Sequence, residues 1–462
     1  MKKIIVLLAF ISINNSTIFS QELKMGIRDS LFSEVLQENR PISIYFPPSY
    51  EANKHQKFPV LYILDGDYNF RYVTGLIELQ SSISENIPEM IVIGISGKGT
   101  TNYRKNCKPA IEGIEDSGNA DEVIQFMKDE LIPFIEKKYK ASNYNMLAGH
   151  SVGGLFVINT VLKNPKLFTN YIAISPALWW ENNSINTIAF EKINSDFKTN
   201  AYLSLANEKG MGVDSFLIIV TKSILKNNIV IFGISIAALI IAIFWFSKTK
   251  KKWRPVLLVI MAIALSSYLY FLYIPSNNNF KFRKFPKENH NSVGVPTYTW
   301  ALKDIFKDWR VEKQYFKSTD ELVQQYDKTK ATYGNAFNMP KGTLTNTVLY
   351  ILKDNTAELN KMQVKIKELY PNSLAYFNTL LATNLIGKKE FDAAEKLLLE
   401  TLVYRPASYE AYQKLAELKK EQQALAQGDS LITNAIELAK KEHVRQWQLN
   451  ELLETKELMY RK

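Results

Sequence analysis

Short apolar runs alternate with segments of helical periodicity from about Pro41 to Pro286. Seven runs are predicted to be strands: ISIYF (42–46), FPVLYILDG (58–66), MIVIGISG (90–97), YNMLAGHS (144–151), YIAISP (171–176), AYLSLANE (201–208) and FKFRKF (280–285). Between two of them, residues 121–139 are amphipathic, with Val123, Phe126, Leu131 and Phe134 on one side of a helix. Strands that alternate with helices predict an α/β fold with a mostly parallel sheet covered on both faces.

Two uncharged segments, 229–247 and 255–274, interrupt this pattern. Each is close to the ~20 residues needed to cross a bilayer core, and aromatic residues stand at their ends. They predict a transmembrane helical hairpin over 229–275, inserted before the last strand; a pair of buried core helices is the alternative. The connecting loop 248–254 is basic at five of its seven positions, which predicts a cytoplasmic loop.

The chain after Trp309 has a helical pattern, and we assign residues 313–462 to a separate helical region. Within it, Phe391, Ala394, Leu398, Thr401 and Pro406 have spacings similar to the second helix of a tetratricopeptide repeat. Residues 372–386 would be the first helix, and 408–420 would begin another pair. This region could bind a protein partner, or it could be a generic helical extension that packs on the rest of the chain.

The N-terminus predicts export. Two lysines precede a mostly apolar core from Ile4 to Ile13 and a polar stretch that ends at Ser20, which is the layout of a secretory signal peptide over residues 1–20. An uncleaved membrane anchor is the alternative. The α/β domain would then comprise residues 21–228 and 276–312.

Composition narrows the function classes. The 462 residues include 57 basic and 46 acidic side chains, a formal net charge of +11, and much of the excess lies near the predicted hairpin. We find no zinc-ligand spacing and no phosphate loop, so the sequence predicts no metal site and no nucleic-acid partner. Cys107 is the only cysteine, which rules out an internal disulfide, and we expect it to be an inert thiol.

Gly149-His150-Ser151-Val152-Gly153 has the G-x-S-x-G pattern, after a predicted strand and before a helical run. A serine on such a strained strand-to-helix turn needs small neighbours so that its Oγ projects from the top of the sheet. The N-terminus of the following helix also favours developing negative charge. Ser151 is therefore the candidate nucleophile.

Elimination selects the general base among four histidines. His150 precedes the serine and is expected to point away from it. His55 lies in an early loop, and His443 lies in the C-terminal helices. His290 remains, in a loop just after a predicted strand, where a general base can reach a serine hydroxyl.

The triad acid should lie between serine and histidine in chain order. Glu208 stands at the end of a predicted strand, a position from which a carboxylate can orient an imidazole. Asp214 is the alternative, although it is also the expected N-cap of a helix that starts at Ser215. We favour Glu208.

Four stretches, KDELIPFIEKKY, LAGHSVGGLF, NYIAISPALWWEN and FPKENHNSV, resemble the esterase family that includes enterochelin and ferri-siderophore esterases and the S-formylglutathione and feruloyl esterases. The resemblance spans about residues 30–306 without the hairpin. It implies an α/β-hydrolase fold without a cofactor, and cleavage of carboxylic esters through an acyl-serine. By this resemblance Ser151 is the nucleophile, His290 the base, and Glu208 occupies the acidic position.

The resemblance also implies the remaining site residues. The amide of Val152, with one from Gly66, Asp67 or Tyr68, would form the oxyanion hole. Trp179 and Trp180 would flank the substrate pocket, although one of the two could be a packing residue. Arg104 keeps a position that relatives use for substrate, whereas Cys107 stands where an acid is usual, which puts substrate contacts there in doubt.

These observations predict a serine esterase tethered to the inner membrane, with its catalytic domain in the periplasm. An even number of spans is required, because a single span would place His290 and Ser151 on opposite sides of the bilayer. The expected substrate is a small-molecule or envelope ester. Two alternatives stay open: an acyltransferase that uses the same triad, and a non-catalytic scaffold in which a degenerate hydrolase and the helical tail bind protein partners.

Overall fold

The computed structural model describes residues 25–51, 56–97, 106–111, 113–115, 117–194, 197–225, 280–311, 318–334, 338–351, 356–442 and 444–460. The predicted signal peptide (1–20), the predicted hairpin (229–274) and Arg104 lie outside these residues. Among the helices that the structure describes, none combines the length and the apolar character needed to cross a bilayer.

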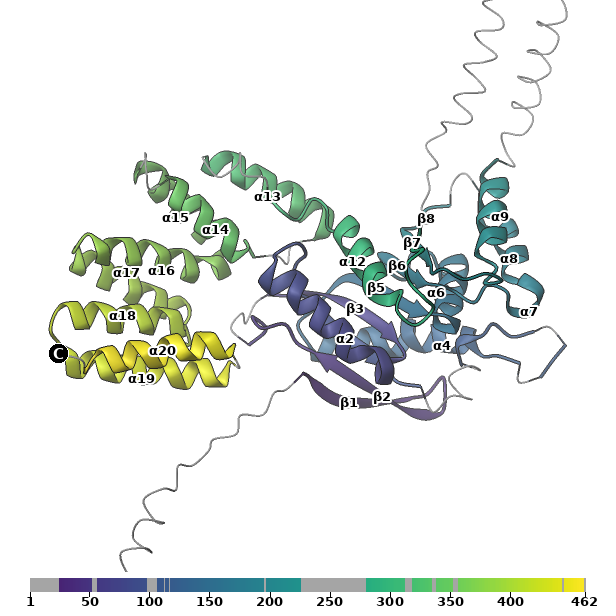
Figure 1. Ribbon diagram of the computed structural model, residues 1–462, viewed down its shortest axis with the longest axis horizontal. Coiled ribbons are helices and arrows are strands. Elements are labelled where there is room, and N and C mark those ends of the chain that lie inside the picture. Colours follow the sequence, from purple (N-terminus) through teal and green to yellow (C-terminus); the bar gives the residue numbers. More distant parts are fainter. Residues whose placement is uncertain are drawn as a thin grey trace, which may run out of the picture.

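In the residues that the structure describes, eight strands form one sheet in the order β1-β2-β4-β3-β5-β6-β7-β8 (Figure 1). The first two pairings, β1 with β2 and β2 with β4, are antiparallel, and all the others are parallel. The prediction of a mostly parallel α/β sheet is confirmed. The strands are β1 (Ile27–Ser33), β2 (Glu38–Tyr45), β3 (Phe58–Leu64), β4 (Ile91–Ile95), β5 (Ala141–His150), β6 (Asn170–Ile174), β7 (Ala201–Leu205) and β8 (Phe280–Lys284).

Strand β1 was not predicted, and its sequence shows why. It is an edge strand with mostly exposed or half-buried side chains, so its polar composition lacks the apolar run that marks the central strands. Strand β3, in contrast, is buried at every position, as expected for a central strand covered on both faces.

Helices cover both faces of the sheet. On one face, α2 (Gly66–Glu78) and α12 (Gly294–Ile305) pack through residues such as Val73, Ile77 and Leu302. On the other face lie α4 (Ala120–Phe126), α5 (Ile132–Lys138), α6 (Val152–Lys163), α8 (Ile185–Lys192) and α9 (Val213–Leu225). Alternate residues of the strands contribute to the two cores, because successive side chains of a strand point to opposite faces.

The single amphipathic helix expected over 121–139 contains a π-helical turn, η2 (Met127–Leu131), between α4 and α5. Val123, Phe126 and Leu131 are buried as predicted, but after the turn Ile132 and Ile135 are buried and Phe134 is only partly so. A π turn inserts one extra residue, which rotates every later position around the helix axis. The helical pattern therefore predicted the first half of the apolar face and not the second.

The C-terminal region is entirely helical in its described part, as predicted. Eight helices stack beside the α/β part (Figure 1): α13 (Thr319–Tyr333), α14 (Lys341–Ile351), α15 (Thr356–Leu369), α16 (Pro371–Gly387), α17 (Phe391–Tyr404), α18 (Tyr409–Glu421), α19 (Leu425–Lys441) and α20 (Gln446–Leu458). Helices α16 and α17 lie where the repeat-like pattern predicted a helical pair. Their assignment to the tetratricopeptide family stays a prediction.

The helical tail packs directly on the α/β part. The Tyr333 hydroxyl of α13 donates to the Ile305 carbonyl at the end of α12, over 3.1 Å. Further along, the Gly342 amide donates to the Glu85 carboxylate at 2.9 Å, and Arg445 forms an ion pair with Glu78 at 3.5 Å. These contacts join three separate points of the tail to the segments around α2 and α12.

Candidate active site

Ser151 stands on a strained turn between β5 and α6. Its φ of 57° and ψ of −114° are unusual for a residue with a side chain. The Ser151 amide donates to the Ile174 carbonyl, and the Ala177 amide donates to the Ser151 carbonyl, both over 2.9 Å. These two bonds to the neighbouring strand and loop hold the turn in its strained form.

Two glycines around the serine are required by close packing. A Cβ atom on Gly149 would stand 2.4 Å from the Gly153 carbonyl oxygen, and one on Gly154 would stand 2.8 Å from Pro176 Cα. Both contacts are with backbone atoms, which cannot move aside as a flexible side chain can. Of the two, Gly149 is the first glycine of the G-x-S-x-G motif, and Gly154 directly follows the motif.

His290 and Glu208 form a close pair, although 82 residues separate them in the chain. His290 Nδ1 lies 2.8 Å from Glu208 Oε2, and the two side chains are 34% and 17% exposed. Glu208 follows β7 and His290 follows β8, and these strands are parallel neighbours. The loops are also tied together, because the Asn207 amide donates to the Glu288 carbonyl at 2.8 Å.

The alternative acid, Asp214, is exposed in the first turn of α9. That helix begins at Val213, so Asp214 lies inside the first turn and is not the N-cap that the sequence indicated. Its acidic side chain near a helix N-terminus suits the helix dipole. The carboxylate that contacts His290 is that of Glu208.

His150 takes a position that sequence reasoning missed. We expected it only to point away from Ser151; its ring packs on the ring of His290, with centroids 4.5 Å apart and an interplanar angle of 39°. Burial, together with the neighbouring His290, lowers the pKa of His150 to about 4. The one sequence signal for this role was the position of His150, directly before the nucleophile and at the end of a central strand. His150 therefore forms a neutral wall for the His290 ring.

The predicted oxyanion turn lies between β3 and α2. Asp65 adopts a left-handed conformation with φ 55°, and a Cβ on Gly66 would stand 2.5 Å from the carbonyl carbon of Gly94. The Tyr68 amide donates to the Asp65 carbonyl at 2.9 Å, so it is already used within the turn. The Asp67 carboxylate accepts a hydrogen bond from the Ser96 hydroxyl at 2.7 Å, which fixes the turn against the end of β4.

The two tryptophans of the ALWWEN stretch have different environments. Trp179 is 48% exposed, whereas Trp180 is partly buried and packs against the hydrophobic core on the side of the sheet that α6 covers. The Lys108 ammonium lies 3.6 Å from the centroid of the Trp180 ring, a cation–π contact. Trp180 therefore has a packing role, and Trp179 is the one free to meet a substrate. Cys107 is buried in the same core and forms no disulfide.

No group of three or more His, Cys, Asp or Glu side chains is placed to hold a metal ion in the described part of the chain. The groups that the structure describes at the site are a hydroxyl, an imidazole, a carboxylate and backbone amides. That set is suited to nucleophilic acyl chemistry.

Comparison with known proteins finds similarity to esterases. Residues 33–220 match the family described as "Putative esterase". The chain is 25% identical over 198 residues to the ferri-bacillibactin esterase of Bacillus subtilis. That alignment covers 39% of this chain and 65% of the Bacillus protein. It is 40% identical over 78 residues to a siderophore enterobactin esterase of Emericella nidulans. That alignment covers 16% of this chain and 26% of the Emericella protein.

The α/β part of the chain resembles the siderophore esterases. A solved structure shares its fold: an IroE-like serine hydrolase from Shewanella oneidensis, with 20% identity and a TM-score of 0.50, covering 76% of this chain and 99% of that one. The fold expected from the resemblance, an α/β-hydrolase-like sheet, is confirmed. The chain spans just under two thirds of the Bacillus subtilis relative, so the siderophore-esterase resemblance concerns this part alone.

Proposed function

We propose that this protein is a serine hydrolase of carboxylic esters that acts through an acyl intermediate on Ser151. The observation that carries the proposal is the 2.8 Å contact between His290 and Glu208, beside a strained serine turn. A carboxylate only accepts hydrogen bonds, so His290 Nδ1 holds the proton and Nε2 is left as the base. This is the tautomer that a general base for a serine requires.

In the proposed reaction, His290 takes the hydroxyl proton as Ser151 Oγ attacks the ester carbonyl. The same proton then passes to the leaving alcohol, and the acyl-serine is hydrolysed by a water that His290 deprotonates. Glu208 keeps the imidazole oriented and stabilises its charged form. His150, which stays neutral above about pH 4, closes one side of the His290 ring.

The amide of Val152, at the N-terminus of α6, would donate to the oxyanion because first-turn amides have no partner within their own helix. The second donor would come from Gly66 or Asp67. The Tyr68 amide is a poor candidate, since the Asp65 carbonyl already accepts its hydrogen bond.

A siderophore ester is the substrate class that we favour, because two curated relatives are siderophore esterases. A direct test is a hydrolysis screen of the full-length chain against a ferri-siderophore lactone, an acetylated glycan and a lipid ester, with Ser151→Ala as the matched control. We expect release of acid from the siderophore ester, and none from the Ser151→Ala variant. Turnover of none of the three by folded protein would instead favour the scaffold, and transfer to an added alcohol would favour an acyltransferase.

We further propose that the enzyme is tethered to the outer face of the inner membrane. The sequence supports this through two separate patterns, the N-terminal signal and the basic loop 248–254 between two apolar segments. Deletion of residues 229–274 should release a protein that keeps its activity on small aryl esters. If the wild-type chain itself fractionates without membranes, the tether is wrong; if the folded deletion variant loses all activity, the hairpin shapes the site.

A further inference from the structure

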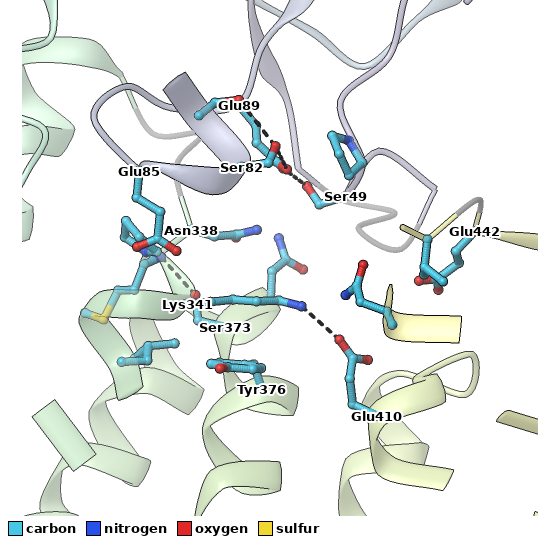
Figure 2. A pocket seen from close by; sticks show the side chains of 18 of the residues that line it. Ser49, Ser82, Glu85, Glu89, Asn338, Lys341, Ser373, Tyr376, Glu410 and Glu442 are labelled. Atoms are coloured by element: carbon cyan, nitrogen blue, oxygen red, sulfur yellow. Dashed lines mark hydrogen bonds and ion pairs between the residues drawn. The ribbon is translucent and has the colours of Figure 1, made fainter. Parts of the chain in front are cut away.

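A cavity of about 470 Å³ lies between the α/β part and the helical tail (Figure 2). One wall comes from the end of α2, the following turn η1 (Leu79–Ile83) and the loop that leads to β4. The other wall comes from helices α14, α16, α18 and α20 and the loops between them. A volume of this size suits a small molecule.

The cavity is separate from the candidate active site. Helix α2 begins at the oxyanion turn and ends at Glu78, which lines the cavity. Its 13 residues span about 20 Å at ~1.5 Å per residue. The cavity and the catalytic turn therefore lie at opposite ends of one helix.

Among the described residues that line the cavity, carboxylates outnumber cations, six against three. All three cations are already engaged: Lys341 with Glu410 at 2.8 Å, Arg405 with Glu442 at 3.4 Å, and Arg445 with Glu78 at 3.5 Å. The other three carboxylates are those of Glu85, Glu89 and Glu451. When all nine groups are ionised, the lining carries three uncompensated negative charges.

Glu85 and Glu89 are held by neutral donors. The Gly342 amide donates to Glu85, and the hydroxyls of Ser49 and Ser82 donate to Glu89. Burial raises the pKa of both carboxyl groups, because their ionised forms are poorly solvated. Lys341, and beside Glu85 also Arg310, lowers these pKa values without cancelling the effect of burial, so a further positive charge next to the two carboxylates would reduce the penalty.

One buried hydroxyl close to the lining residues has no hydrogen-bond partner in the described part of the chain. Tyr45 is 6% exposed, and its hydroxyl hydrogen-bonds to none of the described residues. It lies close enough to three lining residues, Glu78, Glu89 and Arg445, for their charges to shift its pKa. Orphan polar groups of this kind are uncommon in folded proteins and often mark a site that a ligand or water completes.

The cavity already accommodates one ammonium group. Lys341 crosses it with its Nζ pointing to Glu410 (Figure 2), and the same Nζ lies 5.0 Å from the centroid of the Tyr376 ring. Its side chain is 52% exposed, so the interior is open to solvent. Trp309, Tyr409 and Trp447 add aromatic surface to the lining, which is suited to organic cations.

We propose that this cavity binds a small linear polyamine, a flexible chain that carries two or more ammonium groups. Glu85 and Glu89 offer sites for cations on the α/β wall, and Glu451 offers one on the tail wall, so one molecule with spaced charges meets both walls. An organic cation fits better than a metal ion, since no three ligating side chains converge in the described residues. The proposal is independent of the esterase function.

The test is calorimetric titration of the purified full-length chain with spermidine at pH 8 and fixed ionic strength. We expect saturable one-site binding that weakens about fivefold for Glu85→Gln and for Glu89→Gln, the change expected for loss of one ion pair, and more for the double variant. Gln keeps the size and the acceptor oxygen of each side chain. Asp320→Asn, an exposed carboxylate on α13 away from the cavity, is the control and should bind as wild type does.

Binding should also weaken as the pH falls from 8 towards the pKa values of Glu85 and Glu89, because burial raises both pKa values more than the neighbouring Lys341, and Arg310 beside Glu85, lower them. A thermal melt of each variant with and without spermidine checks folding, and a bound ligand should raise the Tm of wild type more than that of the double variant. Absence of saturable binding, equal affinity of the double variant and wild type, or equal displacement by Mg²⁺ at matched ionic strength would overturn the proposal.

Discussion

The Glu208 carboxylate lies 2.8 Å from His290 Nδ1, which joins the loops after β7 and β8. Because these strands are parallel neighbours, their carboxyl ends meet at one edge of the sheet, where β5 also ends with the Ser151 turn. The order of the strands thus brings Glu208 and His290 together, although 82 residues separate them in sequence.

The first prediction separates the two candidate acids. Glu208→Gln should lower kcat by about 10³- to 10⁴-fold, because an amide in place of the carboxylate neither fixes the tautomer of His290 nor stabilises its charged form. Asp214→Asn should leave kcat unchanged, since Asp214 is exposed in the first turn of α9. Steady-state hydrolysis of an aryl ester measures both. Equal effects of the two substitutions would contradict the assignment.

The second prediction concerns acid stability. Burial lowers the pKa of His150 to about 4 in the folded chain, against about 6.5 when unfolded. Between these values the unfolded chain binds the extra proton, so His150 destabilises the fold as pH falls from 6.5 towards 4, by at most about 3 kcal/mol.

Chemical denaturation of wild type and His150→Asn at pH 7, 5.5 and 4.5 measures this effect. The free energy of unfolding of wild type should fall more steeply with acidification than that of the variant, whose residue 150 does not titrate. Parallel pH dependences would show that His150 is not held in its neutral form.

The third prediction uses two glycines of one helix. Gly66→Ala should cost about 2 kcal/mol or more and abolish most activity, because its Cβ meets the β4 backbone at Gly94 and must displace the oxyanion turn. Gly75→Ala places its Cβ in open space in the middle of α2, so it should stabilise the chain by about 0.5–1 kcal/mol. Urea denaturation with an activity assay compares them. A neutral Gly66→Ala would mean that the turn tolerates movement.

The fourth prediction divides the tryptophan pair. Trp180→Ala should lower the free energy of unfolding by about 2 kcal/mol, because it removes core packing and the contact with Lys108. Trp179→Ala should change stability by less than about 0.5 kcal/mol and raise KM for a bulky ester. A wild-type KM in the Trp179→Ala variant would show that the substrate does not contact Trp179.

Much of this architecture could be predicted from sequence because its signals are local. Central strands such as β3 are continuous apolar runs, and the serine turn is marked by its glycines. His290 could be selected only because so few histidines compete with it. Strand β1 lacked a signal, since an edge strand buries too little surface to require an apolar pattern.

The features that sequence could not predict depend on three-dimensional neighbours. Nothing in the helical pattern of 121–139 marks the extra residue of η2, which rotates Phe134 partly out of the core. The contact of His150 with His290 depends on a loop that returns from residue 290. The cavity is built from α2 and helices more than 250 residues later, so no local pattern describes it.

The most direct measurement of the central claim is covalent labelling of the full-length protein with a fluorophosphonate, followed by peptide mapping. The account predicts one modified residue, Ser151, with labelling lost in Ser151→Ala and strongly slowed in Glu208→Gln. A folded wild-type protein that stays unlabelled, or a label that persists in Ser151→Ala, would contradict it.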